Sequence, residues 1–292
     1  MFRGMSDYAR GLAITALGVL IITPDALLLR LISADHWTVL VWRGLGFLLV
    51  QAMIVLARHG RGSAAALRRT GMDGLLVFVL FSLSQCLFVH SITHTTVANT
   101  LVIIAAAPLM AALFAWLMLR ERVERRTLVA GFIGLGAVAL TLSTSIGHGR
   151  LDGDLSALAT MLLLALLFTL LRRAKDRDML PAVAASGLGT MLIALTMADT
   201  VVPPAADWLW LALVALFVSP VSFALISIGP RYLPAPEVGL LMLLETALGP
   251  LWVWLVLAER PDTLTLAGGG ILLSTLIANG ALGMIGRRRH FR

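Results

Sequence analysis

Residues 116–122, Trp-Leu-Met-Leu-Arg-Glu-Arg, recur 138 positions later as residues 254–260, Trp-Leu-Val-Leu-Ala-Glu-Arg. The similarity continues beyond each copy at the same offset, where Thr127, Leu128 and Gly131 match Thr265, Leu266 and Gly269. A repeat of this kind in a very apolar chain indicates one membrane unit used twice. Duplicated membrane units are mostly transporters.

The composition places the chain in a membrane. Hydrophobic residues make up 59% of its 292 positions and charged residues only 13%, whereas a soluble domain carries about a quarter charged residues. The apolar residues come in long runs, and a run of about 20 residues spans the hydrocarbon layer as a helix. The net charge of +7 does not indicate a nucleic-acid partner, because the basic residues stand in short connections between the runs. The single cysteine, Cys86, excludes an intramolecular disulfide and a cysteine-based metal cluster.

The sequence predicts an all-α integral membrane protein with ten transmembrane helices. The first apolar segment resembles a secretory signal, but it is about 22 residues long, lacks a small-x-small cleavage site and precedes many similar segments. We therefore expect it to be retained as the first span. The ten expected spans are 11–32, 36–57, 73–92, 96–119, 127–145, 154–171, 180–199, 207–228, 236–257 and 264–286.

The basic residues predict the orientation of these spans. If the N-terminus is cytoplasmic, 19 of the 23 lysines and arginines lie in cytoplasmic segments. Arg150 and Arg260 lie outside, and Arg30 and Arg43 fall within spans. Because basic residues concentrate on the cytoplasmic side of a membrane, ten spans with both termini cytoplasmic fit best.

The repeat and this topology together predict inverted halves. The first copy of the motif ends helix 4 and the second ends helix 9, so an odd number of spans separates them and they face opposite sides. A weaker echo, Gly44-Leu45-Gly46 and Gly187-Leu188-Gly189, links helices 2 and 7. We expect residues 1–146 to form one five-helix repeat and residues 147–292 to form the other. Inverted repeats commonly support alternating access around a site at the midplane.

Ionisable residues inside spans are the first candidates for a binding site, because they are costly in a membrane. Glu245 in helix 9 could carry a proton or accept a substrate amine, or it could be satisfied structurally by a neighbouring helix. Arg43 in helix 2 could hold a substrate carboxylate while Trp42 packs on its side chain. The alternative, which we favour slightly, is that Arg43 reaches toward the outer interface. Asp25 is expected to pair with Arg30 or Arg43 in a structural role.

The densest polar set lies in helix 3 and at the start of helix 4. Gln85 and Asn99 each offer amide donors and acceptors to a zwitterionic ligand, and His90 titrates near neutrality. Hydrogen bonding between helices uses the same residue types and is the alternative. His94 is expected in the outer connection, without a role.

Four prolines interrupt spans and can leave backbone carbonyls free at membrane depth, as in the kinked helices that line many transport paths. They are Pro24, Pro108, Pro220 and Pro250. Ser219 and Ser222 flank Pro220 and can satisfy the freed backbone.

Known catalytic signatures are missing from the sequence, which contains no HExxH, GxSxG or P-loop motif and no paired carboxylates on one helical face. ATP therefore cannot drive this chain directly. We expect no catalytic residues, no cofactor and no metal site, which leaves secondary transport or facilitated diffusion.

The ten spans, the inverted halves and a Pro-x12-Glu pattern from Pro108 to Glu121 resemble the drug/metabolite transporter superfamily, EamA type. The second copy, from Leu244 to Glu259, resembles the family's Leu-Glu-Pro…Gly-Glu segment but places Thr246 at the usual proline and Pro250 one turn later. Within the superfamily the chain looks similar to YddG-like bacterial exporters of amino acids and methyl viologen. The resemblance implies a central cavity built from helices 1, 3, 4, 6, 8 and 9. The candidates on those helices are Gln85, His90, Asn99, Ser219, Ser222 and Glu245, besides Trp42 and Arg43.

Three functional hypotheses follow. The first is export of amino acids, including aromatic ones, and of related small metabolites across the inner membrane. The second is multidrug export of organic cations with Glu245 as the counter-ion, and the third is a membrane protein that transports nothing. The expected partners are a small-molecule substrate and the lipid bilayer, without nucleic acid, and a monomer is compatible with the sequence.

Overall fold

A computed structural model describes residues 7–120, 125–145, 149–174, 176–226, 232 and 235–290, with the side chains of 119, 235–240 and 281–290 left out. Over these residues the regular structure is entirely helical. The α-helices are α1 Asp7–Ile22, α2 Asp25–Leu31, α3 His36–His59, α4 Ser63–Arg69, α5 Gly71–His94, α6 Val97–Ile104, α7 Ala107–Leu119, α8 Arg125–Ser143, α9 Leu151–Arg173, α10 Leu180–Met197, α11 Trp208–Ala212, α12 Ser219–Ile226, α13 Ala235–Leu257 and α14 Thr263–His290. Two 3₁₀ turns, Gly60–Gly62 and Ala205–Asp207, and a π-helical segment, Leu213–Val218, complete them.

The helices form the predicted membrane bundle. Nine segments of the described residues are long and apolar enough to cross a bilayer. The tenth expected span is α13, of which the apolar part Leu241–Leu257 counts as a shorter helix. Large apolar side chains such as Phe132 and Leu255 are exposed on the outside of the bundle, as the lipid-facing surface of a membrane protein requires. The chain is an all-α membrane protein.

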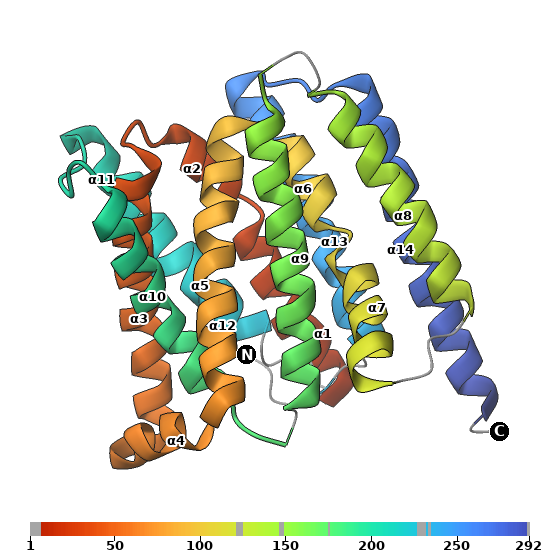
Figure 1. Cartoon of the computed structure of the whole chain (residues 1–292), viewed down its shortest axis with the longest axis horizontal. Helices are drawn as coiled ribbons and strands as arrows, with labels where there is room; N and C mark the ends of the chain where they lie inside the picture. The colour runs from red at the N-terminus through yellow and green to blue at the C-terminus, as the bar shows by residue number, and fades with distance from the viewer. Residues whose placement is uncertain are drawn as a thin grey trace.

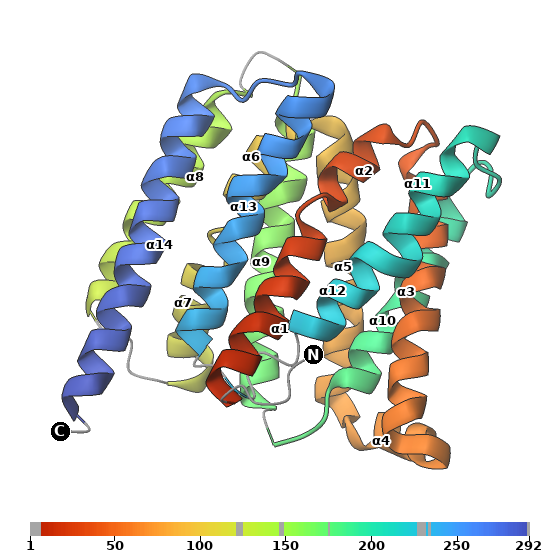
Figure 2. The ribbon, with the colours of Figure 1, turned by 180° about the vertical axis from the view of Figure 1, so that it is seen from behind.

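The two halves run in opposite directions. In Figures 1 and 2, α3 descends from the upper end of the molecule to α4, whereas its counterpart α10 ascends. In the same views α8 ascends and its counterpart α14 descends beside it. The described chain begins and ends at the lower side. The predicted inverted five-helix repeats are therefore confirmed.

The two Gly-Leu-Gly segments lie at one of the crossings where the repeats touch. A Cβ added at Gly44 in α3 would lie 2.7 Å from the carbonyl oxygen of Gly187 and from the amide nitrogen of Met191, both in α10. A Cβ at Gly187 would lie 2.6 Å from the carbonyl oxygen of Gly44 and 2.7 Å from the nitrogen of Leu48. The contacts are reciprocal, as a pseudo-two-fold axis between the repeats requires. Small residues at such a crossing allow two membrane helices to approach closely.

Several spans are broken in the interior of the bundle. The first expected span is divided into α1 and α2 at Thr23-Pro24, and the fourth into α6 and α7 just before Pro108. The eighth contains the π-helical segment immediately before Ser219-Pro220. The amide of Gln51 donates to the carbonyl oxygen of Pro220 at 3.1 Å, so the irregular backbone is partly satisfied by a side chain. Pro250 differs from the expectation, because α13 continues through it.

Irregular backbone at membrane depth is tolerated only where it is buried in protein or lines a cavity. Broken helices of this kind form the binding sites of many transporters. The side chains beside the breaks in α1–α2 and before α12 are therefore candidates for a binding site.

Candidate functional site

A central ionic cluster joins four helices of the bundle. It consists of Asp25 at the start of α2, Arg43 in α3, Ser219 at the start of α12 and Glu245 in α13. Arg43 donates from Nη1 and Nη2 to the two carboxylate oxygens of Asp25 at 2.8 and 2.9 Å. The Ser219 hydroxyl donates to Asp25 at 3.2 Å. The cluster therefore links the first repeat to the second.

The local structure explains why Asp25 and Arg43 meet. Asp25 is the first residue of α2, directly after the Thr23-Pro24 break, so the change in helix direction brings its carboxylate toward α3. Arg43 is 1% exposed and Asp25 2%. Two hydrogen bonds in parallel hold the guanidinium in one orientation. The predicted pairing of Asp25 with Arg43 is confirmed, and the expectation that Arg43 reaches the outer interface is wrong, because a buried counter-charge stabilises it in the interior.

Trp42 does not contribute to this cluster. Its indole nitrogen donates to the carbonyl oxygen of Val201 at 2.8 Å, and its ring meets that of Trp208 edge to face at 4.9 Å. The aromatic ring beneath the Arg43 guanidinium is that of Phe88, 5.9 Å away. Successive side chains of a helix point about 100° apart, so Trp42 and Arg43 lie on different faces of α3.

Glu245 lies within electrostatic range of both Asp25 and Arg43. It is half-buried, and among the described residues it forms no hydrogen bond or ion pair of its own. Asp25 already occupies both terminal nitrogens of Arg43. The cluster thus holds two carboxyl groups against one guanidinium, and Glu245 is the group open to a cationic ligand or a proton.

Gln85 lies one helical turn before Phe88 on α5 and therefore shares its face toward Arg43. It is buried, and its amide forms no hydrogen bond with another described residue. A buried amide that is not bonded to another described residue is suited to a polar ligand.

Asn99 belongs to a different network. Its Nδ2 lies 3.0 to 3.3 Å from Thr144, Ser145 and Asp154, and its Oδ1 accepts from Thr265 at 2.6 Å. Both ends of the amide are thus bound to protein groups on neighbouring helices. This geometry favours the interhelical alternative for Asn99. Sequence reasoning missed its partner Asp154, which is fully buried and also accepts from Thr95, because the expected span began at that residue.

The remaining candidates form no hydrogen bond with the cluster residues in the part of the chain that the structure describes. Ser222 is buried and donates to the backbone oxygen of Val218, within the disturbed helix. This bond does not reach the carbonyl four or five residues before Pro220 that the proline leaves without an N–H donor, and the Ser219 hydroxyl donates to Asp25 instead of to the backbone. His90 lies near the upper end of α5, where its ring stacks on that of His94 at 3.9 Å. His94 is the last residue of α5 rather than part of the connection after it.

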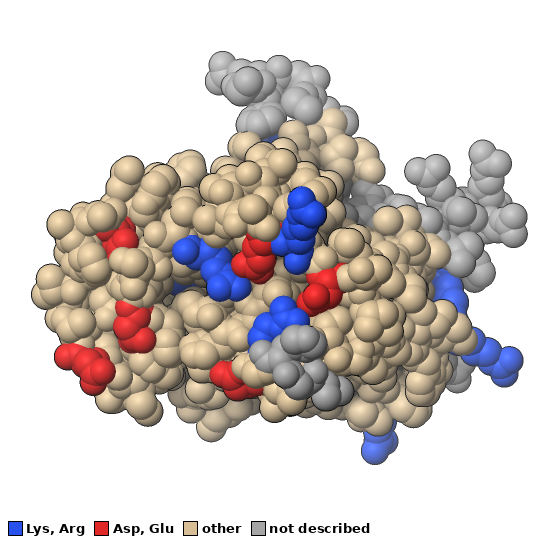
Figure 3. Space-filling view, turned by 90° about the horizontal axis from the view of Figure 1, so that it is seen from above, with Lys and Arg blue, Asp and Glu red and all other residues tan. Residues whose placement is uncertain are grey.

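Ion pairs lie at the upper ends of the repeats, and one of them, Arg30–Glu259, joins the first repeat to the second. Glu259, at the end of the second copy of the repeated motif, accepts from the amide nitrogen of Val97 at 3.0 Å and pairs with Arg30 at 3.3 Å. Arg150 pairs with Asp262 at 3.0 Å. Figure 3 shows acidic side chains spread over this upper face and basic ones near its middle. Both contacts of Glu259 are to the first repeat of the protein, whereas Glu121 lies outside the described residues.

The family model of the EamA-like transporters matches the chain twice, over residues 10–143 and 151–280. The chain belongs to the EamA-like transporter family. The two matches correspond to the two inverted repeats. Membership of this transporter family agrees with the multi-pass helical architecture.

Individual relatives are distant. The EamA-like chain is 26% identical over 181 residues to an uncharacterized transporter of Bacillus subtilis (strain 168), YetK, covering 55% of this chain and 52% of the relative. The match thus spans about half the length of YetK. An uncharacterized transporter of Archaeoglobus fulgidus is 27% identical over 207 residues, 70% of this chain and 74% of that one. A solved crystal structure of a protein with 17% identity superposes with a TM-score of 0.65 over 96% of this chain and 98% of that chain, which shows the fold alone.

Proposed function

We propose that this EamA-like protein is a secondary transporter that exports amino acids and related small metabolites from the cytoplasm by alternating access. The observation that carries the proposal is the central ionic cluster, which lies between the repeats and beside the helix breaks. A site at the repeat interface can be exposed to one side of the membrane and then the other when the repeats rock against each other.

The cluster is chemically complementary to an amino acid. The guanidinium of Arg43 and the hydroxyl of Ser219 suit the α-carboxylate, because an arginine presents parallel donors that match a carboxylate. Glu245 suits the α-ammonium group, and Gln85 offers further hydrogen bonds. In this proposal the substrate carboxylate competes with Asp25 for Arg43. His90, Ser222, Asn99 and Trp42 do not contact the substrate in the conformation described.

We further propose that residues 1–146 and 147–292 are the two repeats and that the lower side is cytoplasmic, in a bacterial inner membrane. Two basic segments described at that side, the end of α4 with Arg68 and Arg69 and the end of α9 with Arg172 and Arg173, support this orientation. On the upper side, Arg30 and Arg150 are each paired with an acidic residue. Release would then require the Arg30–Glu259 pair, which joins the two repeats, to open.

Purified protein in liposomes tests the proposal. We expect it to move labelled amino acids across the vesicle membrane at rates well above those of empty vesicles. The panel should include neutral, aromatic, acidic and basic amino acids, because the cluster recognises the common ammonium and carboxylate groups. Flux equal to that of empty vesicles for every member of the panel would contradict amino-acid export.

Export of organic cations is the second candidate, favoured by the absence of a dedicated cationic partner for Glu245 among the described residues. The variant Glu245→Gln distinguishes amino-acid export from export of organic cations. If the substrate is an amino acid, we expect the exchange to lower neutral amino-acid transport at least about tenfold, since losing a buried charge partner costs 2–5 kcal/mol. If the substrate is a cationic drug, the exchange abolishes cation transport and spares neutral amino acids. Asp73→Asn, at an ion pair with Arg177 outside the bundle core, is the matched control and should change neither.

A further inference from the structure

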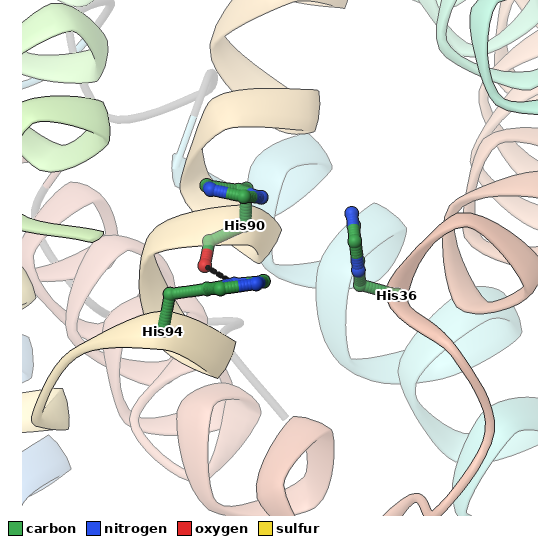
Figure 4. Close-up of side chains that lie close together, drawn as sticks. All are labelled: His36, His90 and His94. Atoms are coloured by element: carbon green, nitrogen blue, oxygen red, sulfur yellow. Dashed lines mark hydrogen bonds between the residues drawn. The ribbon is translucent and has the colours of Figure 1, made fainter. Parts of the chain in front are cut away.

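Three histidines meet at the upper end of the bundle, away from the central ionic cluster. His36 is the first residue of α3, and His90 and His94 lie one turn apart at the end of α5. Figure 4 shows the rings of His90 and His94 one above the other, with His36 facing them from the neighbouring helix. One ring nitrogen from each histidine can be chosen so that all three lie within 4.8 Å of one another. From this arrangement we propose that the three histidines bind a divalent transition-metal ion of the Zn²⁺ class.

The hydrogen bonds of two of these histidines leave a nitrogen lone pair for a metal. Nδ1 of His94 lies 2.8 Å from the carbonyl oxygen of His90, which can only accept, so this nitrogen carries the proton when it bonds there. Nδ1 of His36 lies 3.2 Å from the carboxylate of Asp35. In each ring Nε2 then has its lone pair available. A carbonyl or carboxylate behind the ligating imidazole is the usual outer arrangement at metal sites.

His36 provides an independent sign of an additional ligand. Its Nε2 is buried and has no hydrogen-bond partner among the described residues. Buried polar atoms are rarely left without a partner. A metal ion among the three rings would supply that partner.

The surroundings favour a cation and supply further ligands. Asp152, at the start of α9, lies 3.8 Å from Nε2 of His90. It can orient this ring or provide an oxygen ligand. Asp35 is itself held by the amide nitrogen of Trp37 at 2.9 Å. Three imidazoles with a carboxylate or water suit Zn²⁺, Co²⁺ or Ni²⁺, whereas Mg²⁺ and Ca²⁺ take mainly oxygen ligands.

Binding of a metal ion requires only a small movement of the three histidine rings. Zn–N bonds of about 2.0–2.1 Å in a tetrahedral site place the nitrogens roughly 3.4 Å apart, which rotation of the partly exposed rings can achieve. The bound ion would connect α3 with α5 and, through Asp152, with the first helix of the second repeat. It would therefore hold the upper ends of these three helices together.

Metal titration of the full-length protein, purified without a polyhistidine tag, tests the site. We expect one Co²⁺ per chain with the visible absorption of a tetrahedral nitrogen site, displacement by Zn²⁺, and a higher Tm with Zn²⁺. His36→Ala and His94→Ala should each lower the affinity at least about 100-fold. Asp35→Asn should lower it about tenfold or more, as outer-shell exchanges do.

His59→Ala is the matched control, because His59 contacts Asp178 at the lower side and lies far from the cluster in the chain. It should leave the affinity unchanged. The three-histidine site is overturned if wild-type protein shows no tetrahedral Co²⁺ spectrum, or if His36→Ala and His94→Ala bind metal as tightly as wild type. An equal loss of affinity in His59→Ala overturns it as well. These outcomes are independent of whether amino acids are transported.

Discussion

Exchange of either partner of the Asp25–Arg43 pair alone is expected to destabilise the protein strongly and to abolish transport. Asp25→Asn leaves a buried guanidinium without its counter-charge, and Arg43→Gln leaves a buried carboxylate. Breaking a buried ion pair in this way costs roughly 3–5 kcal/mol. The double exchange removes both charges and should recover most of the stability. It should still fail to transport amino acids, because the guanidinium proposed to hold the substrate carboxylate is gone. Thermal unfolding in detergent and flux in liposomes measure the two effects.

The control for this pair is Arg177→Gln, which removes an exposed ion pair with Asp73. Exposed pairs contribute about 0–1 kcal/mol, so the Tm should barely change. Wild-type stability of both single variants would show that the pair is not held as described. Wild-type flux through the double variant would show that the pair has a structural role alone, and substrate binding would have to be assigned elsewhere.

The second large effect is expected at the crossing of α3 and α10. Gly44→Ala places a methyl group 2.7 Å from backbone atoms of Gly187 and Met191, which no side-chain rotation can relieve. The helices must separate, and overpacking of this kind costs typically 1–3 kcal/mol. We expect a fall in Tm on the order of 5 °C for Gly44→Ala and for Gly187→Ala, measured by thermal unfolding.

Gly131→Ala and Gly136→Ala in α8 are matched controls, because an added Cβ there meets nothing within 4 Å. They should leave the Tm unchanged or raise it slightly, since alanine is the better helix former. The double variant of Gly44 and Gly187 should lose less than the sum of the two single losses, because one separation of the helices accommodates both methyl groups. Strict additivity, or equal effects in α8, would contradict the reciprocal crossing.

The repeated motif and the Gly-Leu-Gly echo are short, yet they predicted that the fold consists of two related halves. With the uneven distribution of basic residues, they predicted ten spans in two inverted repeats, and the reciprocal contacts of Gly44 and Gly187 lie where the echo placed them. Hydrophobic span length and the asymmetry of basic residues are imposed by the bilayer on any chain that crosses it, and the repeated motifs reflect the duplication of one unit.

Whether a candidate residue is free to bind a ligand depends on its contacts with other helices, and the sequence of a single span does not contain those contacts. Gln85 and Asn99 have equivalent amides and neighbouring positions in the chain, yet Asn99 is fully bonded to protein groups while Gln85 is not. Which of them is free depends on the helices packed opposite, here those that carry Asp154 and Thr265. The sequence also contained no signal that His36 would join His90 and His94, because 54 positions separate it from the nearer one.

Membrane insertion, helix number and inverted orientation follow from the sequence, since hydrophobic length and charge asymmetry act on each segment independently of its neighbours. The partners of the buried polar groups follow from the packing of helices remote in the chain. The break at Thr23-Pro24 brings Asp25 to Arg43. Because of this contact, Arg43 lies in the interior, at the centre of the proposed binding site, and not at the membrane interface where the sequence predicted it.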